Sequence, residues 1–268
     1  MMPFPVSRIL LMLFMLSCIP VVAQQENTRH FTIGIGPAYQ SMLDQGISPL
    51  LYDGFQFAFM LGFERHRPRI SHVASFRALM GDLNSDRQEV MGSHISNSCL
   101  DINYSLRYRL WQNPDGRLKA FAGPGLSSLQ FYRVHDGFSN SAYSNYFLNT
   151  ISVQGFLNFD FLLFGRRFGL LGGLDLPLLT YAFRQAYTIP AMDGLLQGKE
   201  GLDALLSSGE VYTPGSFWGI GSQWHFLYQL KNGNAIALEY HSHFHSLDDI
   251  NPVKDARHQL IFKALFKF

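Results

Sequence analysis

The chain has 268 residues, of which 15% are charged, against about 25% in an ordinary soluble domain, and it contains 24 Phe and 12 Tyr. Its formal net charge is only +1 and it has no basic run, so nucleic acid is excluded as a partner. Its longest apolar runs are too short for a membrane-spanning helix, which needs about 20 apolar residues.

Residues 1–23 have the features of a secretory signal. Arg8 closes a basic start, residues 9–16 are all apolar, and Ala23 ends a small-residue stretch where cleavage is expected. A lipoprotein signal with Cys18 as the lipidated residue is the alternative. If Cys18 is removed, Cys99 is the only cysteine left, and no disulfide within the chain can form. The mature chain, residues 24–268, is therefore expected outside the cytoplasm.

The rest of the chain alternates apolar and polar residues with the period of two that defines a strand. The segment 54–65 is the clearest, with Phe55, Phe57 and Phe59 on one face and Gln56, Ala58 on the other. Large apolar residues opposite a mixed row are typical of a wall between lipid and a polar lumen. The predicted strands are 29–40, 54–65, 70–81, 100–110, 117–132, 151–163, 168–179, 216–230, 235–244 and 258–268.

The expected connections alternate between long and short. Those at 41–53, 82–96, 133–149, 180–215 and 245–256 are long, and those at 66–68, 112–116, 165–167 and 231–234 are short. Within the longest, residues 199–206 fit either a short helix or a mobile loop. Short periplasmic turns, long external loops and an even strand number are typical of bacterial barrels. The sequence therefore predicts an all-β fold, a ten-stranded antiparallel transmembrane β-barrel in the bacterial outer membrane.

The closing segment carries a family resemblance. Glu239-Tyr240, Leu247 to Ile250, and Ala256 to His258 running into a strand that ends in Phe268 resemble the end of PorT-like outer-membrane barrel proteins of Bacteroidota. The resemblance covers the signal, the overall length and about the last thirty residues. It implies the fold, the outer-membrane location, and recognition of the Phe268 strand by the barrel assembly machinery, but no role in secretion.

Charged residues on the inward rows predict a luminal network. A barrel of about eight strands already has space only for side chains or one small ligand, so opposed charges are expected to pair and plug a ten-stranded one. A conducting pore is the alternative. The predicted network comprises Glu64, Arg77, Asp101, Arg107, Arg109, Asp160, Asp175, Glu239 and Lys263, with Lys119 and Lys267 on the same rows.

Histidines on neighbouring strands are candidate metal ligands. His241, His243 and His245 share one face of a strand, and His225 lies on the strand before. Three in line span too far for one ion, so a zinc site would use His225, His241 and His243, with ordinary luminal hydrogen bonds as the alternative. Because both strands turn odd-numbered residues inward, we expect a three-residue loop at 232–234 that places His225 opposite His241.

A lipid A deacylase-like enzyme is a second functional reading. That chemistry needs a histidine and a serine on one face, two residues apart. Here Ser242 and Ser246 each follow a histidine directly, so the spacing is wrong. We therefore expect a non-enzymatic structural or interaction protein without a cofactor. Its expected partners are outer-membrane lipid and an envelope protein that contacts the external loops.

Overall fold

The computed structural model describes residues 28–46, 48–86, 93–135, 143–184, 209–248 and 251–268. The predicted signal, Cys18 and the segment 199–206 lie outside these residues. In the described part, no helix is long and apolar enough to cross a membrane. All of its regular elements are strands: β1 (Thr28–Asp44), β2 (Ser48–His66), β3 (Ile70–Asn84), β4 (His94–Gln112), β5 (Leu118–His135), β6 (Tyr143–Leu163), β7 (Arg166–Arg184), β8 (Glu210–Tyr212), β9 (Phe217–Gln229), β10 (Ala235–Leu247) and β11 (Val253–Lys267).

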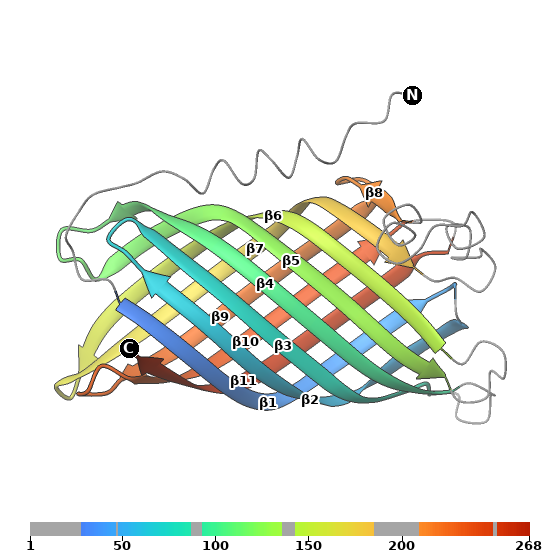
Figure 1. The fold of residues 1–268 in the computed structure, drawn as a ribbon, viewed down its shortest axis with the longest axis horizontal. Coiled ribbons are helices and arrows are strands. Elements are labelled where there is room, and N and C mark those ends of the chain that lie inside the picture. Colours follow the sequence, from blue (N-terminus) through green and yellow to red (C-terminus); the bar gives the residue numbers. More distant parts are fainter. Residues whose placement is uncertain (1–27, 47, 87–92, 136–142, 185–208, 249–250) are drawn as a thin grey trace.

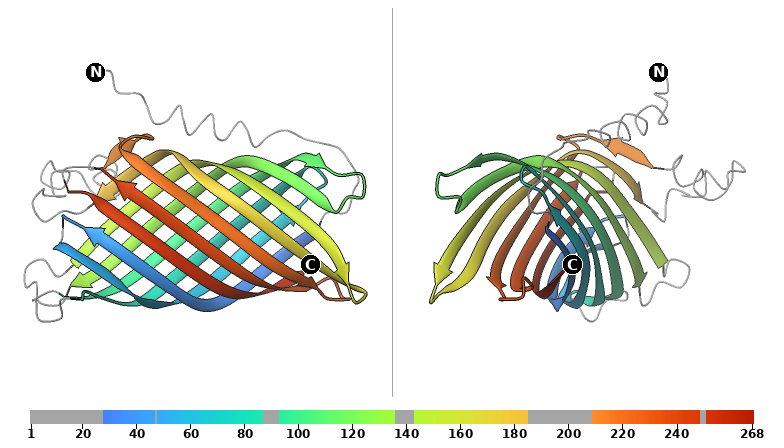
Figure 2. Two further views of the ribbon diagram at one scale, coloured as in Figure 1. Left: turned by 180° about the vertical axis from the view of Figure 1, so that it is seen from behind. Right: turned by 60° about the vertical axis from the view of Figure 1, so that its left-hand side comes forward.

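Ten of the described strands form a closed antiparallel barrel, as predicted (Figures 1 and 2). Sequence neighbours pair from β1 to β7, β7 pairs with β9, and the order continues through β10 to β11. Pairing of β1 with β11 closes the wall, for example at Ile33 and Ala264. The short β8 pairs with β7 at residues 180–182, beyond the last β7–β9 pair at Asp175 and Gly221.

The two ends of the barrel differ in their connections. At one end lie Thr28, Lys267 and the connections 67–69, 113–117, 164–165 and 230–234; we call it the turn end. At the other, the loop end, lie the connections between β1 and β2, β3 and β4, β5 and β6, β7 and β9, and β10 and β11. Figure 1 shows the turn end on the left, near the label of the C-terminus.

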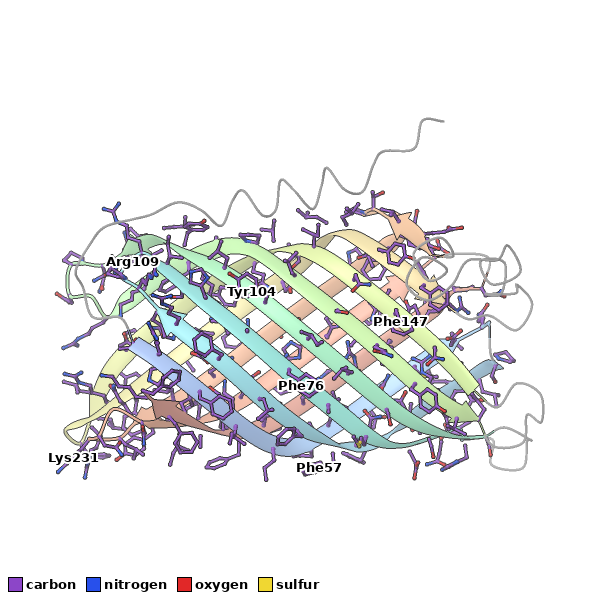
Figure 3. All side chains as sticks on the ribbon, viewed as in Figure 1. Phe57, Phe76, Tyr104, Arg109, Phe147 and Lys231 are labelled. Carbon is purple, nitrogen blue, oxygen red and sulfur yellow. The ribbon has the colours of Figure 1, made fainter. Side chains whose placement is uncertain are left out.

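The outer face of the wall is apolar over the turn end and the middle of the barrel. Phe57, Phe76 and Tyr104 point away from the wall in Figure 3, and they are 57%, 37% and 37% exposed. On β3 and β4 the outer row becomes polar toward the loop end: the Ser96 hydroxyl donates to exposed Asp82 at 2.9 Å. Strands of about 19 residues, tilted by about 40°, rise about 48 Å, well over the ~25 Å apolar band of such barrels. The loop-end part of the wall therefore stands outside the lipid.

The interior is packed toward the loop end. Met42, Tyr52, Leu83 and Ile95 form one fully buried apolar cluster there. A second cluster fills the adjoining part of the lumen and includes Leu79, Cys99, Phe131, Tyr146, Leu148, Phe217, Leu247, Val253 and Ile261. At the turn end the corresponding cluster has only Ala235, Ala237 and Leu265, with Leu227 against it.

The strands reach further toward the loop end than the sequence predicted. β1 continues to Asp44 and β2 begins at Ser48, so the segment 41–53 is not a long loop. Similarly, β10 ends at Leu247 and β11 begins at Val253, which reduces the expected loop at 245–256. Polar residues led to these assignments, but in a wall that extends beyond the lipid both faces of a strand can be polar.

The predicted register between β9 and β10 is wrong by two residues. His225 lies opposite Glu239, and His241 lies opposite Gln223. The loop has three residues as expected, but they are 231–233: Leu230 N–H donates to the Asn234 carbonyl at 2.8 Å. Gly233 adopts the left-handed conformation, with a φ of 86°. Because the loop begins one residue earlier than predicted, each β9 residue pairs with a β10 residue two positions away from the predicted one. The odd-numbered residues of both strands still face the lumen.

Candidate functional site: a luminal ion-pair network and cavity

A cluster of ion pairs crosses the lumen at mid-height. Arg77 on β3 donates to Glu239 on β10 at 2.8 Å, although three other strands separate them along the wall. Lys263 on β11 contacts the second oxygen of Glu239 at 2.6 Å, and His225 lies 3.5 Å from the same oxygen. Glu239 is 0% exposed, and its carboxylate contacts two buried cations. The Arg77–Glu239 contact joins opposite walls across the middle of the barrel.

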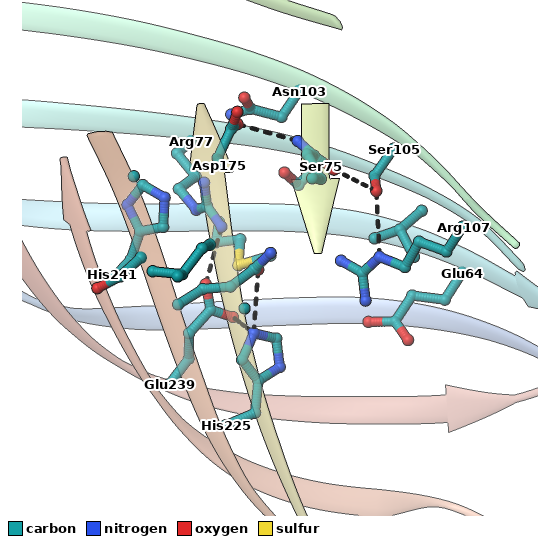
Figure 4. A pocket seen from close by; sticks show the side chains of 18 of the residues that line it. Glu64, Ser75, Arg77, Asn103, Ser105, Arg107, Asp175, His225, Glu239 and His241 are labelled. Atoms are coloured by element: carbon teal, nitrogen blue, oxygen red, sulfur yellow. Dashed lines mark hydrogen bonds and ion pairs between the residues drawn. The ribbon is translucent and has the colours of Figure 1, made fainter. Parts of the chain in front are cut away.

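Two cavities lie beside this cluster, against β7 and β9. The mid-lumen cavity has a volume of about 50 Å³ (Figure 4). A larger one of about 190 Å³, which we call the vestibule, extends to His66, Ser71 and Asp160 near the turns. The two share four lining residues, which form the neck between them: Glu64, Arg107, His225 and Lys263.

Arg107 and Glu64 are positioned by their own strands. The Nε of Arg107 donates to Ser105 Oγ at 3.1 Å, and its guanidinium lies over the Phe156 ring at 3.8 Å. On the neighbouring strand β5, Gly123 lets the two backbones approach closely beside Arg107, since an added Cβ would lie 1.8 Å from the Leu106 carbonyl oxygen. Glu64 is held by His66, at 3.0 Å. Figure 4 shows Arg107 and Glu64 facing each other with no bond drawn between them.

The other predicted network residues are distributed along the barrel. Asp101 lies 3.8 Å from Arg77, and Asp175 accepts a bond from Gln154 at 3.0 Å beside the mid-lumen cavity. Asp160 pairs with Lys119 at 2.7 Å at the mouth of the vestibule. Arg109 is not in the network: it donates to Gln112 at the turn end. The structure thus joins Arg77, Asp101, Glu239 and Lys263 directly, but not the whole predicted set.

A second charged cluster, absent from the predicted set, lies at the loop end. Asp44 bridges Arg133, at 3.2 Å, and Arg184. Arg257 donates to Asp255 at 2.9 Å, and Gln40 bonds the same carboxylate. Asp44, Arg133, Asp255 and Arg257 are each at most 2% exposed.

These residues lie in stretches that the sequence reading assigned to loops or strand ends. The signal was nevertheless present. Asp255 and Arg257 continue the odd-numbered inward row of Gln259 and Lys263, and Asp44 continues the even-numbered row of Gln40 and Met42. Extending the alternation past the first polar outward residue would have included them.

Two of the candidate histidines, His225 and His243, lie beside luminal cations. His225 lies 3.3 Å from the Lys263 ammonium, and His243 lies 3.1 Å from Arg257. A cation beside each ring opposes binding of a metal ion. In the described chain, no group of three or more His, Cys, Asp or Glu residues is arranged to hold a metal. The hypothesis of a zinc site at His225, His241 and His243 loses the cross-strand pair on which it depended.

The serines near these histidines point the other way. Ser242 Oγ bonds Ser222 Oγ at 2.8 Å, on the even-numbered outer row, whereas His241 and His243 are on the inward row. A nucleophile and its base must share a face. Strand alternation therefore keeps this serine and these histidines apart.

The fold, the apolar outer belt and the charged interior define the class of protein: a closed, ten-stranded transmembrane β-barrel of the outer-membrane type. No family model and no curated protein matches the chain.

Several solved structures resemble it. The outer membrane protease OmpT from Escherichia coli is 10% identical, with 91% of this chain and 99% of that chain covered and a TM-score of 0.49. Neisserial surface protein A is 10% identical, covering 89% and 97%, with a TM-score of 0.39. Ail of Yersinia pestis is 11% identical, covering 88% and 98%, with a TM-score of 0.31. Similarity at this level assigns no activity.

Proposed function

We propose that this protein is a closed, non-enzymatic barrel of the bacterial outer membrane that acts as a structural or interaction protein through its loop end. The observation that carries the proposal is the filling of the lumen: Arg77 and Glu239 link opposite walls, and Lys263 contacts the same Glu239 carboxylate from the neighbouring strand. Toward the loop end, apolar side chains and the pairs of Asp44 fill the remaining cross-section. We expect a lumen filled in this way to lack a continuous water path for ions.

Conductance of the purified full-length protein in planar bilayers tests the closed lumen. We expect a baseline without unitary steps in 1 M KCl, at a protein amount at which a known porin gives steps. Regular steps from this barrel would overturn the proposal in favour of a small pore. The enzyme alternative is tested separately by comparing lipid A species in cells with and without the protein. We expect identical species; a lost or gained acyl chain would establish an enzyme.

Location and orientation are part of the same proposal. Export with cleavage near Ala23 delivers the chain, and its resemblance to PorT-like barrels of Bacteroidota supports this route. The turn end would face the periplasm and the loop end the exterior. Protease added to whole cells should then cut within 180–215 and leave 113–116 intact. Cleavage at the turn instead would mean that the barrel is inverted.

The C-terminal strand would be the contact for the barrel assembly machinery. β11 closes the barrel against β1, and the Phe268 N–H donates to the Arg29 carbonyl at 3.2 Å. Deleting Phe268 should lower the amount of folded barrel in the outer membrane while leaving refolding of the purified chain in lipid nearly unchanged. An equal loss in both assays would assign Phe268 to stability rather than to recognition.

A further inference from the structure

Arg107 presents an open hydrogen-bonding face to the neck of the lumen. The residue is only 7% exposed, and its Nε is bonded to Ser105. Within the described chain, its two terminal nitrogens have no hydrogen-bond or ion-pair partner. Contact with the Phe156 ring fixes the guanidinium plane, so the open edge is directed rather than mobile. Two parallel N–H donors on a fixed guanidinium match the two oxygens of a carboxylate.

The vestibule leads from this edge to the turn end. Its volume is about 190 Å³, and its lining includes four large apolar side chains: Phe121, Leu171, Leu227 and Leu265. A cavity of about 150 Å³ holds one benzene molecule, so the vestibule has space for an apolar body of that size plus a carboxylate. The charged neck lies at its inner end and the turns at its outer end.

We propose that the vestibule is a binding site for a small monocarboxylate with an apolar body of about five or six carbon atoms, which enters from the turn end. The carboxylate accepts two hydrogen bonds from Arg107, and the body packs against Phe121 and the three leucines. Lys263 contributes less to binding of the carboxylate, because its ammonium already pairs with Glu239 at 2.6 Å. Such a site is compatible with a closed barrel, since the ligand enters and leaves at the same end.

Glu64 is the residue that opposes this ligand. Its carboxylate lines both cavities and faces Arg107 across the neck. A bound carboxylate must share the attraction of Arg107 with Glu64 and is repelled by it. Removing the Glu64 charge should therefore strengthen binding, and removing the Arg107 charge should abolish it. A purely apolar ligand would be nearly indifferent to both changes.

The test uses the full-length protein in lipid nanodiscs and hexanoate as the probe, titrated by calorimetry with empty nanodiscs subtracted. Hexanamide has the same size and no charge. We expect hexanoate to bind at least about tenfold more tightly than hexanamide or acetate. Arg107→Gln should weaken hexanoate binding at least about tenfold, and Glu64→Gln should strengthen it several-fold.

Arg109→Gln is the matched control, because it removes the same charge from the same strand but outside both cavities, and it should leave hexanoate binding unchanged. If Arg107→Gln does not fold, Arg107→Lys replaces it; a lysine keeps the charge without the paired donors and should still weaken binding. Equal binding of hexanoate and hexanamide, no binding of either, or no effect of Glu64→Gln would each overturn the proposal.

Discussion

The two halves of this barrel are built in opposite ways. Around the middle and the turn end, the outer face is apolar and the interior contains two cavities. At the loop end, the outer face of β3 and β4 becomes polar and the interior is packed with buried side chains. In the first half, lipid packs against the wall from outside. In the second, the wall stands in water, and its apolar contacts must come from within the lumen.

This difference has a consequence for where charges are buried. The loop-end cluster of Asp44, Arg133 and Arg184 connects strands on opposite sides of a region that lipid does not support. The Lys119–Asp160 pair at the turn end is partly exposed and lies at the mouth of a cavity. Breaking the buried Asp44 pairs should therefore lower the free energy of unfolding much more than breaking the partly exposed Lys119–Asp160 pair.

Asp44→Asn should have the largest effect. The change leaves Arg133 and Arg184 buried without their counter-charge, which costs about 3–5 kcal/mol. Asp160→Asn breaks a partly exposed pair and should cost under about 1 kcal/mol. Guanidinium unfolding of the full-length protein in lipid vesicles measures both. Equal costs would mean that the turn end is packed as tightly as the loop end.

Phe76→Arg tests where the lipid lies. Phe76 sits on the outer face between Leu61 and Ile102, both on apolar outward rows, and a charge there should cost about 2–4 kcal/mol. Ser98→Arg places the same charge on the outer face near the loop end and should cost about 0–1 kcal/mol. The same unfolding assay compares the two. A similar cost at Ser98 would extend the lipid belt to the loop end.

A double-mutant cycle measures the link across the lumen. Glu239→Gln and Arg77→Met should show a coupling free energy of about 1–3 kcal/mol, because the pair is buried and in contact. The cycle of Lys119→Met with Asp160→Asn should give no more than about 1 kcal/mol. A coupling free energy near zero in the Glu239 cycle would mean that the ion pair across the lumen does not stabilise the barrel.

The sequence predicted the fold and the inward rows because strand alternation is local. Phe57 and Gln56, or Phe262 and Lys263, differ by one position and lie on opposite faces as expected. It did not predict which inward charges meet. Arg77 and Glu239 are 162 positions apart and contact across the lumen, and such a distance depends on barrel radius and tilt rather than on local pattern.

The strand ends and the register were also missed. Polar residues such as Asp44 and Asp255 are typical of loops, so they were assigned to loops although the two-residue alternation continues through them into the packed interior at the loop end. The position of a three-residue loop within Leu230 to Asn234 depends on which residue takes the left-handed conformation, and both Gly233 and Asn234 can adopt it.

Gly233→Ala gives the smallest effect and tests that corrected loop. At a φ of 86° an added Cβ is strained, and it would lie 2.8 Å from the Lys267 side chain, so we expect a loss of about 1–2 kcal/mol. Gly155→Ala is the control, since a Cβ there meets nothing within 4 Å and the residue lies within β6, so its effect should be near zero or slightly stabilising. If the loop were instead 232–234 with Asn234 left-handed, Gly233→Ala would be tolerated and Asn234→Ala would carry the cost. Unfolding of Gly233→Ala and Asn234→Ala in the same vesicles therefore tests the observed register, in which His225 faces Glu239 rather than His241.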